Sequence, residues 1–301
     1  MYYVVYGLLY LVSLLPLRVL YLLSDFAWFI IYRVKGYRKA VVMHNLAIAF
    51  PEKTEAEREK IARQFYRQFT DTFIESIKLI SMSEKQAARR SQIDIDYINQ
   101  LIEKGHNIHI MVGHQFNWEF ANIIYARRMK IPFVGVYAPI GNKIFDRIFY
   151  KTRSRYGTIL ISTRQFTGRM HHVFASQYVL GLAADQNPSN ASRGYWLRYF
   201  GQPAPFVTGP AKGAVKNNTA VVFVGFERIK RGYYAYRTIP ITEEASAYTP
   251  EQLTVLYKQA LEKFIRQNPS NYLWTHRRWR HEWQPEYGPV IEDDIVTQHI
   301  K

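Results

Sequence analysis

The sequence predicts an α/β fold, in which one mixed-sheet domain with helical cover follows an N-terminal helical segment that anchors it to a membrane. Two observations carry this prediction. Short apolar runs bounded by turn residues alternate with amphipathic helical patterns, and the first 32 residues are almost free of charge. Because neither a repeat nor a Pro/Gly-rich linker divides the 301 residues, we expect an anchor over residues 1–36 and one globular domain over residues 37–301.

The N-terminal segment has the composition of a membrane anchor. Only Arg18 and Asp25 are charged between residues 1 and 32, and a basic cluster follows at once, formed by Arg33, Lys35, Arg38 and Lys39. Pro16 interrupts the apolar run, so one spanning helix and two interfacial helices both remain open. The basic cluster predicts that the rest of the chain stays on the cytoplasmic side. The alternative is a buried helix at the start of a soluble protein.

Local patterns define the first long helix of the globular domain. Thr54 and Glu57 form a predicted capping box. Apolar side chains then recur every four residues, at Ile61, Phe65, Phe69, Phe73 and Ile77. This spacing predicts a helix of roughly 25 residues whose aromatic stripe faces the core or the membrane.

The sheet is predicted from short apolar runs further along the chain. Five runs have the length and composition of buried strands, at residues 108–112, 133–137, 158–161, 178–183 and 220–226. A turn at residues 230–232 joins the last run to another at residues 233–239, which predicts a hairpin. Thr249 and Pro250 then predict the start of a helix.

Composition excludes several classes of function. With no cysteine, the chain cannot form disulfides, cysteine-ligated metal sites or a cysteine acyl-enzyme. No phosphate-binding glycine motif indicates a nucleotide cofactor, and a spacing of three puts His106 and His109 on opposite faces of a strand, which argues against a metal site. The net charge of +16 predicts an anionic partner. Since no nucleic-acid-binding motif is present, anionic lipid is favoured over nucleic acid.

The candidate catalytic residues stand at strand ends, where open α/β sheets bind their ligands. His114 follows the strand predicted at residues 108–112, and Glu119 comes five positions later. A base and its orienting carboxylate fit this spacing if the chain turns between them. Asp185, at the end of another strand, is a second candidate partner. His281 and Glu286 repeat the spacing in a Pro- and Trp-rich tail, where no strand-to-helix turn is readable.

The residues around His114 resemble a known family signature. The segment Gly113-His114-Gln115-Phe116-Asn117-Trp118-Glu119 is similar to the H-x-x-N-W-E motif of the lipid A biosynthesis (late) acyltransferases, within the lysophospholipid acyltransferase superfamily. Further blocks occur in the family's order, namely Tyr37-Arg38 with Asn45-Leu46-Ala47-Ile48-Ala49-Phe50-Pro51-Glu52, Ala184-Asp185-Gln186-Asn187-Pro188, Phe200-Gly201 with Gly209-Pro210-Ala211, and Trp274-Thr275-His276-Arg277-Arg278-Trp279. The resemblance therefore covers nearly the whole chain.

The resemblance implies an O-acyltransferase of the inner membrane that moves a fatty acyl group to a hydroxyl of a lipid A precursor or related anionic glycolipid. The donor would be a thioester of acyl carrier protein or coenzyme A. His114 would be the general base, with Glu119 holding its tautomer and Asp185 as the second candidate partner. The implied substrate-binding residues are Asn117, Arg155, Arg164, Gln186, Arg277 and Arg278.

Two points stay open within this resemblance. Residues 157–164 approximate the superfamily's acceptor-binding G-x-x-x-I-x-R block with one extra residue, so Arg164 and Arg155 compete for the phosphate contact. The acceptor could also be a lysophospholipid, a phosphatidylinositol mannoside or an amino-acid lipid. A non-catalytic basic protein that docks on membranes is the alternative outside the enzyme class.

Overall fold

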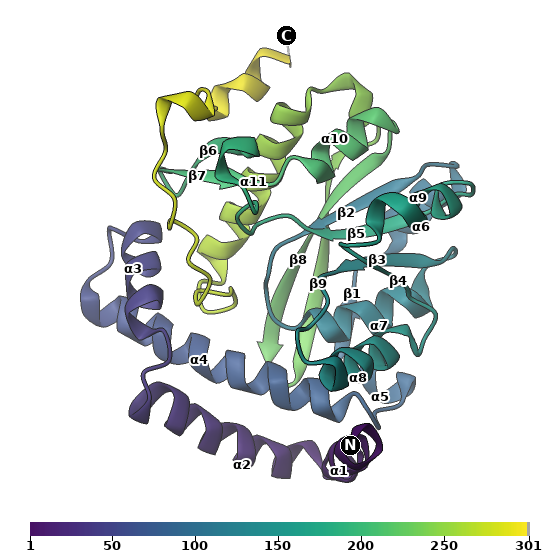
Figure 1. The fold of residues 1–301 in the computed structure, drawn as a ribbon, viewed down its shortest axis with the longest axis vertical. Coiled ribbons are helices and arrows are strands. Elements are labelled where there is room, and N and C mark those ends of the chain that lie inside the picture. Colours follow the sequence, from purple (N-terminus) through teal and green to yellow (C-terminus); the bar gives the residue numbers. More distant parts are fainter. Residues whose placement is uncertain (300–301) are drawn as a thin grey trace.

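The computed structural model describes residues 1–299 and confirms the α/β class (Figure 1). Its sheet has seven strands in the order β1-β9-β8-β2-β5-β3-β4. Their bounds are β1 Ser91–Ile93, β2 Ile108–Val112, β3 Phe133–Tyr137, β4 Ile159–Ser162, β5 Val179–Ala183, β8 Ala220–Lys230 and β9 Tyr233–Thr242. Strands β1 and β9 are parallel to each other and run against the other five, because β9 returns from β8 through the predicted hairpin.

The five predicted strands are confirmed, with ends that shift by at most one residue except at β8, which extends four residues further. The sequence did not indicate β1, which has three residues, or the separate hairpin of β6 (Tyr195–Tyr199) and β7 (Gln202–Phe206). Strand β7 contains two prolines, Pro203 and Pro205. Proline weakens a strand pattern and is tolerated at sheet edges, which is where this two-stranded hairpin places it.

Helices cover both faces of the sheet, and alternate side chains of β8 enter two different cores. Val221 and Phe223 pack in a core with α4 and α11, whereas Val222 and Val224 pack in a core with α6 and α7. The helix bounds are α3 Lys39–Ala49, α4 Glu55–Lys78, α5 Glu84–Ala88, α6 Asp96–Glu103, α7 Trp118–Arg128, α8 Lys143–Ser154, α9 Phe166–Val173, α10 Gly209–Lys216 and α11 Pro250–Gln267.

Helix α4 confirms the longest helix predicted from the sequence. Thr54 and Glu57 form the expected capping box, with Glu57 accepting from the Thr54 backbone at 2.8 Å. The aromatic stripe divides along the helix, since Phe65 is buried whereas Phe73 is 53% exposed. The stripe therefore belongs to the core at one end and to the surface at the other.

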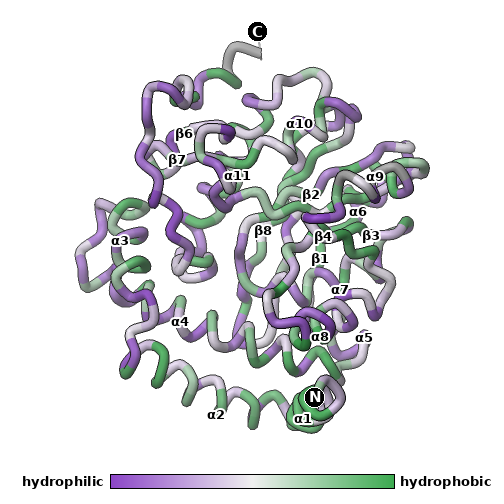
Figure 2. The backbone as a smooth tube through the Cα atoms, in the orientation of Figure 1, coloured by the Kyte–Doolittle hydropathy of each residue, from purple (hydrophilic) through white to green (hydrophobic). Residues whose placement is uncertain are grey.

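The N-terminal segment forms α1 (Tyr2–Leu14), α2 (Leu17–Trp28) and a continuing π-helical turn (Phe29–Val34). In residues 1–299 no single helix is long and apolar enough to cross a membrane. The pair of 2–14 and 17–34 has sufficient length and apolar composition together, but it bends by 114° at the break. Figure 2 shows the apolar colouring of α1 and α2 along the lower edge of the molecule. The outward side chains include Leu8, Leu11, Leu22 and Phe26, each at least 60% exposed.

Helix α2 is also joined to the body of the protein. Leu20 is fully buried, and the hydroxyls of Tyr21 and Ser24 donate to Glu75 and Asp71 of α4 at 2.7 Å each. The predicted alternative of a buried helix therefore holds for one face of α2, whereas the opposite face is apolar and exposed. The membrane anchor stays a prediction.

Candidate active site

The topology of the sheet brings His114 and Asp185 together. Strands β2 and β5 are parallel neighbours whose register pairs Val112 with Ala183. His114 and Asp185 each follow two residues later, so they lie at the same edge of the sheet. The His114 Nδ1 atom lies 2.6 Å from Asp185 Oδ1, and the His114 backbone N–H donates to Asp185 Oδ2 at 2.9 Å. The carboxylate therefore fixes both the ring and the backbone of His114.

Gly113 permits this arrangement because α11 packs directly against it. A Cβ atom at this position would lie 2.5 Å from a methyl carbon of Leu261 and 3.7 Å from Asp185 Oδ2. A larger residue would force the Leu261 side chain to move. Glycine immediately before His114 therefore lets α11 pack closely beside the site.

The electrostatics of the pair suit a base with an ionised partner. Burial alone would lower the pKa of His114, but the charge and hydrogen bond of Asp185 outweigh it, so the pKa is raised. Burial would raise the pKa of Asp185, but the contacts with His114 and the Tyr272 hydroxyl lower it to about 2. Asp185 is thus a carboxylate at neutral pH, and the bond to Nδ1 leaves Nε2 as the nitrogen that accepts a proton. The His114 side chain is 26% exposed, so a substrate can reach it.

Glu119 has a different partner from the one that the sequence predicts. Its carboxylate accepts from Arg153 Nε at 2.9 Å and from Arg153 Nη2 at 2.5 Å, and the Trp118 indole donates to it at 3.0 Å. Asp185 occupies the orienting position on His114 instead. From the sequence, Glu119 is expected to hold the imidazole tautomer. In the structure it forms an ion pair with Arg153 instead.

Asn117 is placed inside the protein and not against a substrate. Its side chain is fully buried, caps α7 by accepting from the Glu119 backbone N–H at 3.1 Å, and donates to Glu75 at 2.8 Å. Glu75 also accepts from the hydroxyls of Tyr21 and Tyr234. Burial raises the pKa of Glu75. We therefore assign Asn117 to positioning α7 in place of the substrate contact expected from the sequence.

A cavity of about 330 Å³ opens beside His114, Glu119 and Arg153. This volume falls within the roughly 300–1,000 Å³ range of small-molecule sites. The wall away from these three polar residues is mainly apolar and comes from β2, β3, β4, β5, β8 and α7, including Ile110, Val112, Ala121, Tyr125, Phe133, Val136, Leu160, Leu182 and Phe226. The arrangement joins one polar end that carries a candidate base to an apolar interior.

Comparison with known proteins identifies this chain. A model of the bacterial lipid A biosynthesis acyltransferase family matches residues 1–281. The chain belongs to this family. It is 25% identical to a lipid A biosynthesis acyltransferase of Haemophilus influenzae, over 76% of this chain and 72% of that protein.

Two relatives from Escherichia coli have names that specify the acyl group. The lipid A biosynthesis lauroyltransferase is 24% identical over 91% of this chain and 89% of its own length. The lipid A biosynthesis palmitoleoyltransferase is 21% identical over 81% and 79%. The match covers most of each relative, so the protein is an acyltransferase and the family recognised in the sequence is confirmed.

Two of the arginines expected to bind substrate have structural contacts in this acyltransferase. The Arg155 guanidinium donates to the backbone carbonyls of Ile80 and Met82, at 3.1 and 3.5 Å. Arg278 is 1% exposed, and its Nη1 donates to Asn187 and to the Pro205 carbonyl. Burial lowers the pKa of Arg278. These two arginines therefore brace loops in the structure, and their contact with the acceptor stays a prediction.

The remaining predicted substrate residues lie around the site without lining its cavity. Arg164 and Arg277 are exposed, and Gln186 is half-buried next to Asp185. Arg277 borders a separate cavity with His44 and Asn45. Their roles stay predictions.

Arg153 also lines the cavity, and it is not among the substrate-binding residues that the family resemblance implies. It lies 34 positions after Glu119, on α8, and its side chain is 19% exposed. No local motif marks it, since the ion pair depends on how α8 packs beside α7. His276 also lies near the site, since the charges of Asp185 and His114 act on it, and burial together with the charge of Arg278 lowers its pKa to about 4. Its place in the C-terminal family block was the available signal.

Proposed function

We propose that this acyltransferase moves a fatty acyl chain from a thioester of acyl carrier protein or coenzyme A to a hydroxyl of a lipid A precursor or related glycolipid. The observation that carries the proposal is the 2.6 Å contact between His114 and Asp185, on a histidine that also lines a largely apolar cavity. The family membership and the names of the Escherichia coli relatives support the acceptor class.

The chemistry needs a base, an oxyanion site and no covalent intermediate on the protein, because a thioester is already activated. His114 Nε2 takes the proton of the acceptor hydroxyl as its oxygen forms a bond with the thioester carbonyl carbon. The tetrahedral oxyanion then collapses and the C–S bond breaks. The leaving thiolate recovers the proton from the imidazolium, which gives an ester and a free thiol.

Charge on the protein is arranged for this step. Asp185 offsets the positive charge that forms on His114. We assign the oxyanion to the N-terminal end of α7 and the Arg153 guanidinium, which lines the same cavity. Glu119 holds that guanidinium in place through its ion pair. In this account Glu119 is a positioning residue that acts through Arg153.

The apolar interior of the cavity is the proposed site of the acyl chain. Its walls include apolar side chains such as Ile110, Leu160 and Phe226. Burying an acyl chain against them is favourable, because it removes apolar surface from water. The thioester carbon would then lie at the polar end, near His114. In this arrangement the reacting carbon and the acceptor hydroxyl would lie on the same side of the base.

The proposed location is the inner membrane, with the catalytic domain on the cytoplasmic side. Residues 1–36 would contact the bilayer, and residues 37–301 would form the acyltransferase domain. The exposed apolar side chains of α1 and α2 support this division, as does the basic cluster that follows them. Because α2 forms hydrogen bonds with α4, the proposed membrane-contacting segment would be joined directly to the acyltransferase domain.

The test uses the purified full chain in detergent, with acyl carrier protein and coenzyme A thioesters as alternative donors. Acceptors are a lipid A precursor and a lysophospholipid, and mass spectrometry detects the new ester. We expect transfer to the glycolipid with one of the two donors, and loss of transfer in His114→Ala. Transfer to the lysophospholipid alone would contradict the proposed acceptor and leave the base in place.

A further inference from the structure

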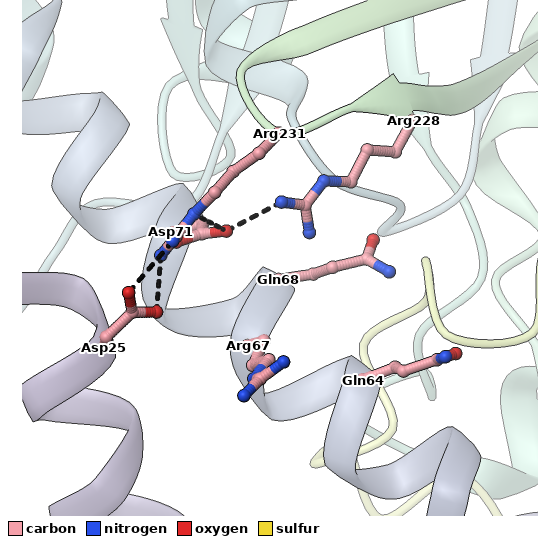
Figure 3. A pocket seen from close by; sticks show the side chains of 7 residues that line it. All are labelled: Asp25, Gln64, Arg67, Gln68, Asp71, Arg228 and Arg231. Atoms are coloured by element: carbon pink, nitrogen blue, oxygen red, sulfur yellow. Dashed lines mark hydrogen bonds and ion pairs between the residues drawn. The ribbon is translucent and has the colours of Figure 1, made fainter. Parts of the chain in front are cut away.

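We propose that a pocket between α2, α4 and the β8–β9 turn binds the phosphate of a membrane-lipid headgroup, outside the catalytic cavity. Figure 3 shows its lining residues, Asp25, Gln64, Arg67, Gln68, Asp71, Arg228 and Arg231. The volume is about 410 Å³. The lining has three arginines against two aspartates, a formal charge of 3 − 2 = +1. Such a pocket suits an anionic and hydroxyl-bearing group.

Both aspartates form ion pairs with two of the arginines. Asp71 is 1% exposed and accepts from Arg228 at 2.8 Å and from Arg231 at 2.6 Å. Arg231 also reaches Asp25 at 2.8 Å, which joins α2 to α4 through one guanidinium. The dashed lines of Figure 3 trace this chain of ion pairs. It forms one wall of the pocket. Within residues 1–299, Arg67 is the arginine of the pocket that no carboxylate pairs with.

Arg67 is held in place without using its hydrogen-bond donors. Its guanidinium lies 4.6 Å from the centre of the Trp28 ring, a cation–π contact, and its side chain is exposed. The planar fork is therefore oriented and available to bind two phosphate oxygens at once, which is the arrangement that arginine favours.

A second polar group in the pocket lacks a partner. Gln68 is 8% exposed and donates its amide N–H to Ser270, but its Oε1 atom is buried and accepts no hydrogen bond. A buried acceptor without a donor is destabilising. A hydroxyl on the headgroup, such as that of a glycerol or a sugar, would donate to Gln68 Oε1 and remove this cost.

The surroundings of the pocket favour a lipid over a free phosphate compound. Helix α2 carries Asp25 at the rim. On the adjoining face, Leu22 and Phe26 of α2 and Phe29 of the π-helical turn are 68%, 65% and 51% exposed. An acyl chain could lie along this face while the phosphate reaches Arg67. The inference rests on the proposed membrane location, so its test measures binding separately from acyl transfer.

Binding of the full chain to vesicles provides the test, with phosphatidylcholine alone compared with phosphatidylcholine that contains phosphatidylglycerol. The variants are Arg67→Gln, Arg67→Lys and Arg63→Gln. Arg63 is the matched control because it is exposed, stands one turn earlier on α4 and borders a different pocket. Since Arg67 is also exposed, we expect all variants to fold, which thermal unfolding checks.

We expect Arg67→Gln to weaken binding to phosphatidylglycerol vesicles about tenfold. Arg63→Gln should weaken it less than about fivefold, as a surface cation near an anionic membrane does. Arg67→Lys should fall between them, because lysine keeps the charge but not the fork. Equal losses for Arg67→Gln and Arg63→Gln would overturn the proposal, since diffuse charge and not a site would then attract the membrane.

A second measurement separates the two sources of a lipid phosphate. The KM of the glycolipid acceptor is determined in neutral detergent micelles that contain no phospholipid. A raised KM in Arg67→Gln, with unchanged binding to phosphatidylglycerol vesicles, assigns the site to the acceptor's own phosphate. Weaker vesicle binding with an unchanged KM assigns it to a membrane phospholipid. No change in either measurement overturns the site, whatever the acyl-transfer activity of the protein.

Discussion

Two histidines of this chain stand five residues before a glutamate, and their surroundings differ completely. His114 follows a buried parallel strand and contacts a carboxylate 71 residues away. His281 is half-buried in a mostly exposed segment near the C-terminus and accepts from the neighbouring Arg280 at 2.8 Å. Burial and the charge of Arg280 lower the pKa of His281. The spacing alone therefore does not bring a carboxylate to a histidine, whereas the carboxyl edge of the sheet does so by placing Asp185 beside His114.

Removal of the proposed base should cause the greatest loss of acyl transfer. His114→Ala should lower acyl transfer by roughly 10²-fold or more, the usual contribution of a general base. His281→Ala serves as the matched control, and it should leave turnover nearly unchanged. Both are measured with purified acceptor and thioester. Comparable losses in the two variants would remove the distinction between these regions.

The next effect concerns the partner of His114. Asp185→Asn should lower acyl transfer by about tenfold or more, because an amide neither neutralises the imidazolium nor enforces one tautomer. Glu286→Gln, the sequence partner of the other histidine, is the control. If Asp185→Asn retained normal turnover, the contact between Asp185 and His114 would be structural only.

Glu119 should matter less to the chemistry and more to stability. Glu119→Gln removes a carboxylate that is 5% exposed and leaves the mostly buried Arg153 without its ion pair. We expect about a tenfold loss of activity and a loss of roughly 2–3 kcal/mol in the free energy of unfolding. Chemical denaturation measures the second quantity. An unchanged unfolding midpoint would show that the ion pair contributes nothing to the fold.

The smallest effect is a change of specificity in the cavity beside His114. Ala121 is 4% exposed and lines it, so Ala121→Leu should shorten the space for an acyl chain. Short-chain donors should gain about tenfold in rate relative to the longest donor. Ala62→Leu enlarges a buried residue of the other core and controls for overpacking. If the rates with donors of all chain lengths changed equally, the acyl chain would bind outside this cavity.

Sequence patterns predicted the parts of the fold that depend on nearby residues. The capping box of α4 and the strands next to His114 are set by residue types within a few positions. The partner of His114 could only be narrowed to two candidates, because the choice depends on β5 lying next to β2 in the sheet. The contact between Glu119 and Arg153 likewise depends on the packing of α7 against α8. Tertiary packing determines these two contacts, and the residues nearby in sequence do not indicate them.

The assignment of Asp185 as the partner of a catalytic His114 is tested by the pH dependence of kcat/KM for acyl transfer. The comparison is between wild type, Asp185→Asn and Glu119→Gln. Because the base must be neutral and Asp185 raises the pKa of His114, the wild-type rate should rise with pH through a value above the usual imidazole pKa of about 6.5. Asp185→Asn should move this rise to lower pH, and Glu119→Gln should leave it in place. A shift in Glu119→Gln without one in Asp185→Asn would contradict the assignment of Asp185 as the partner of His114.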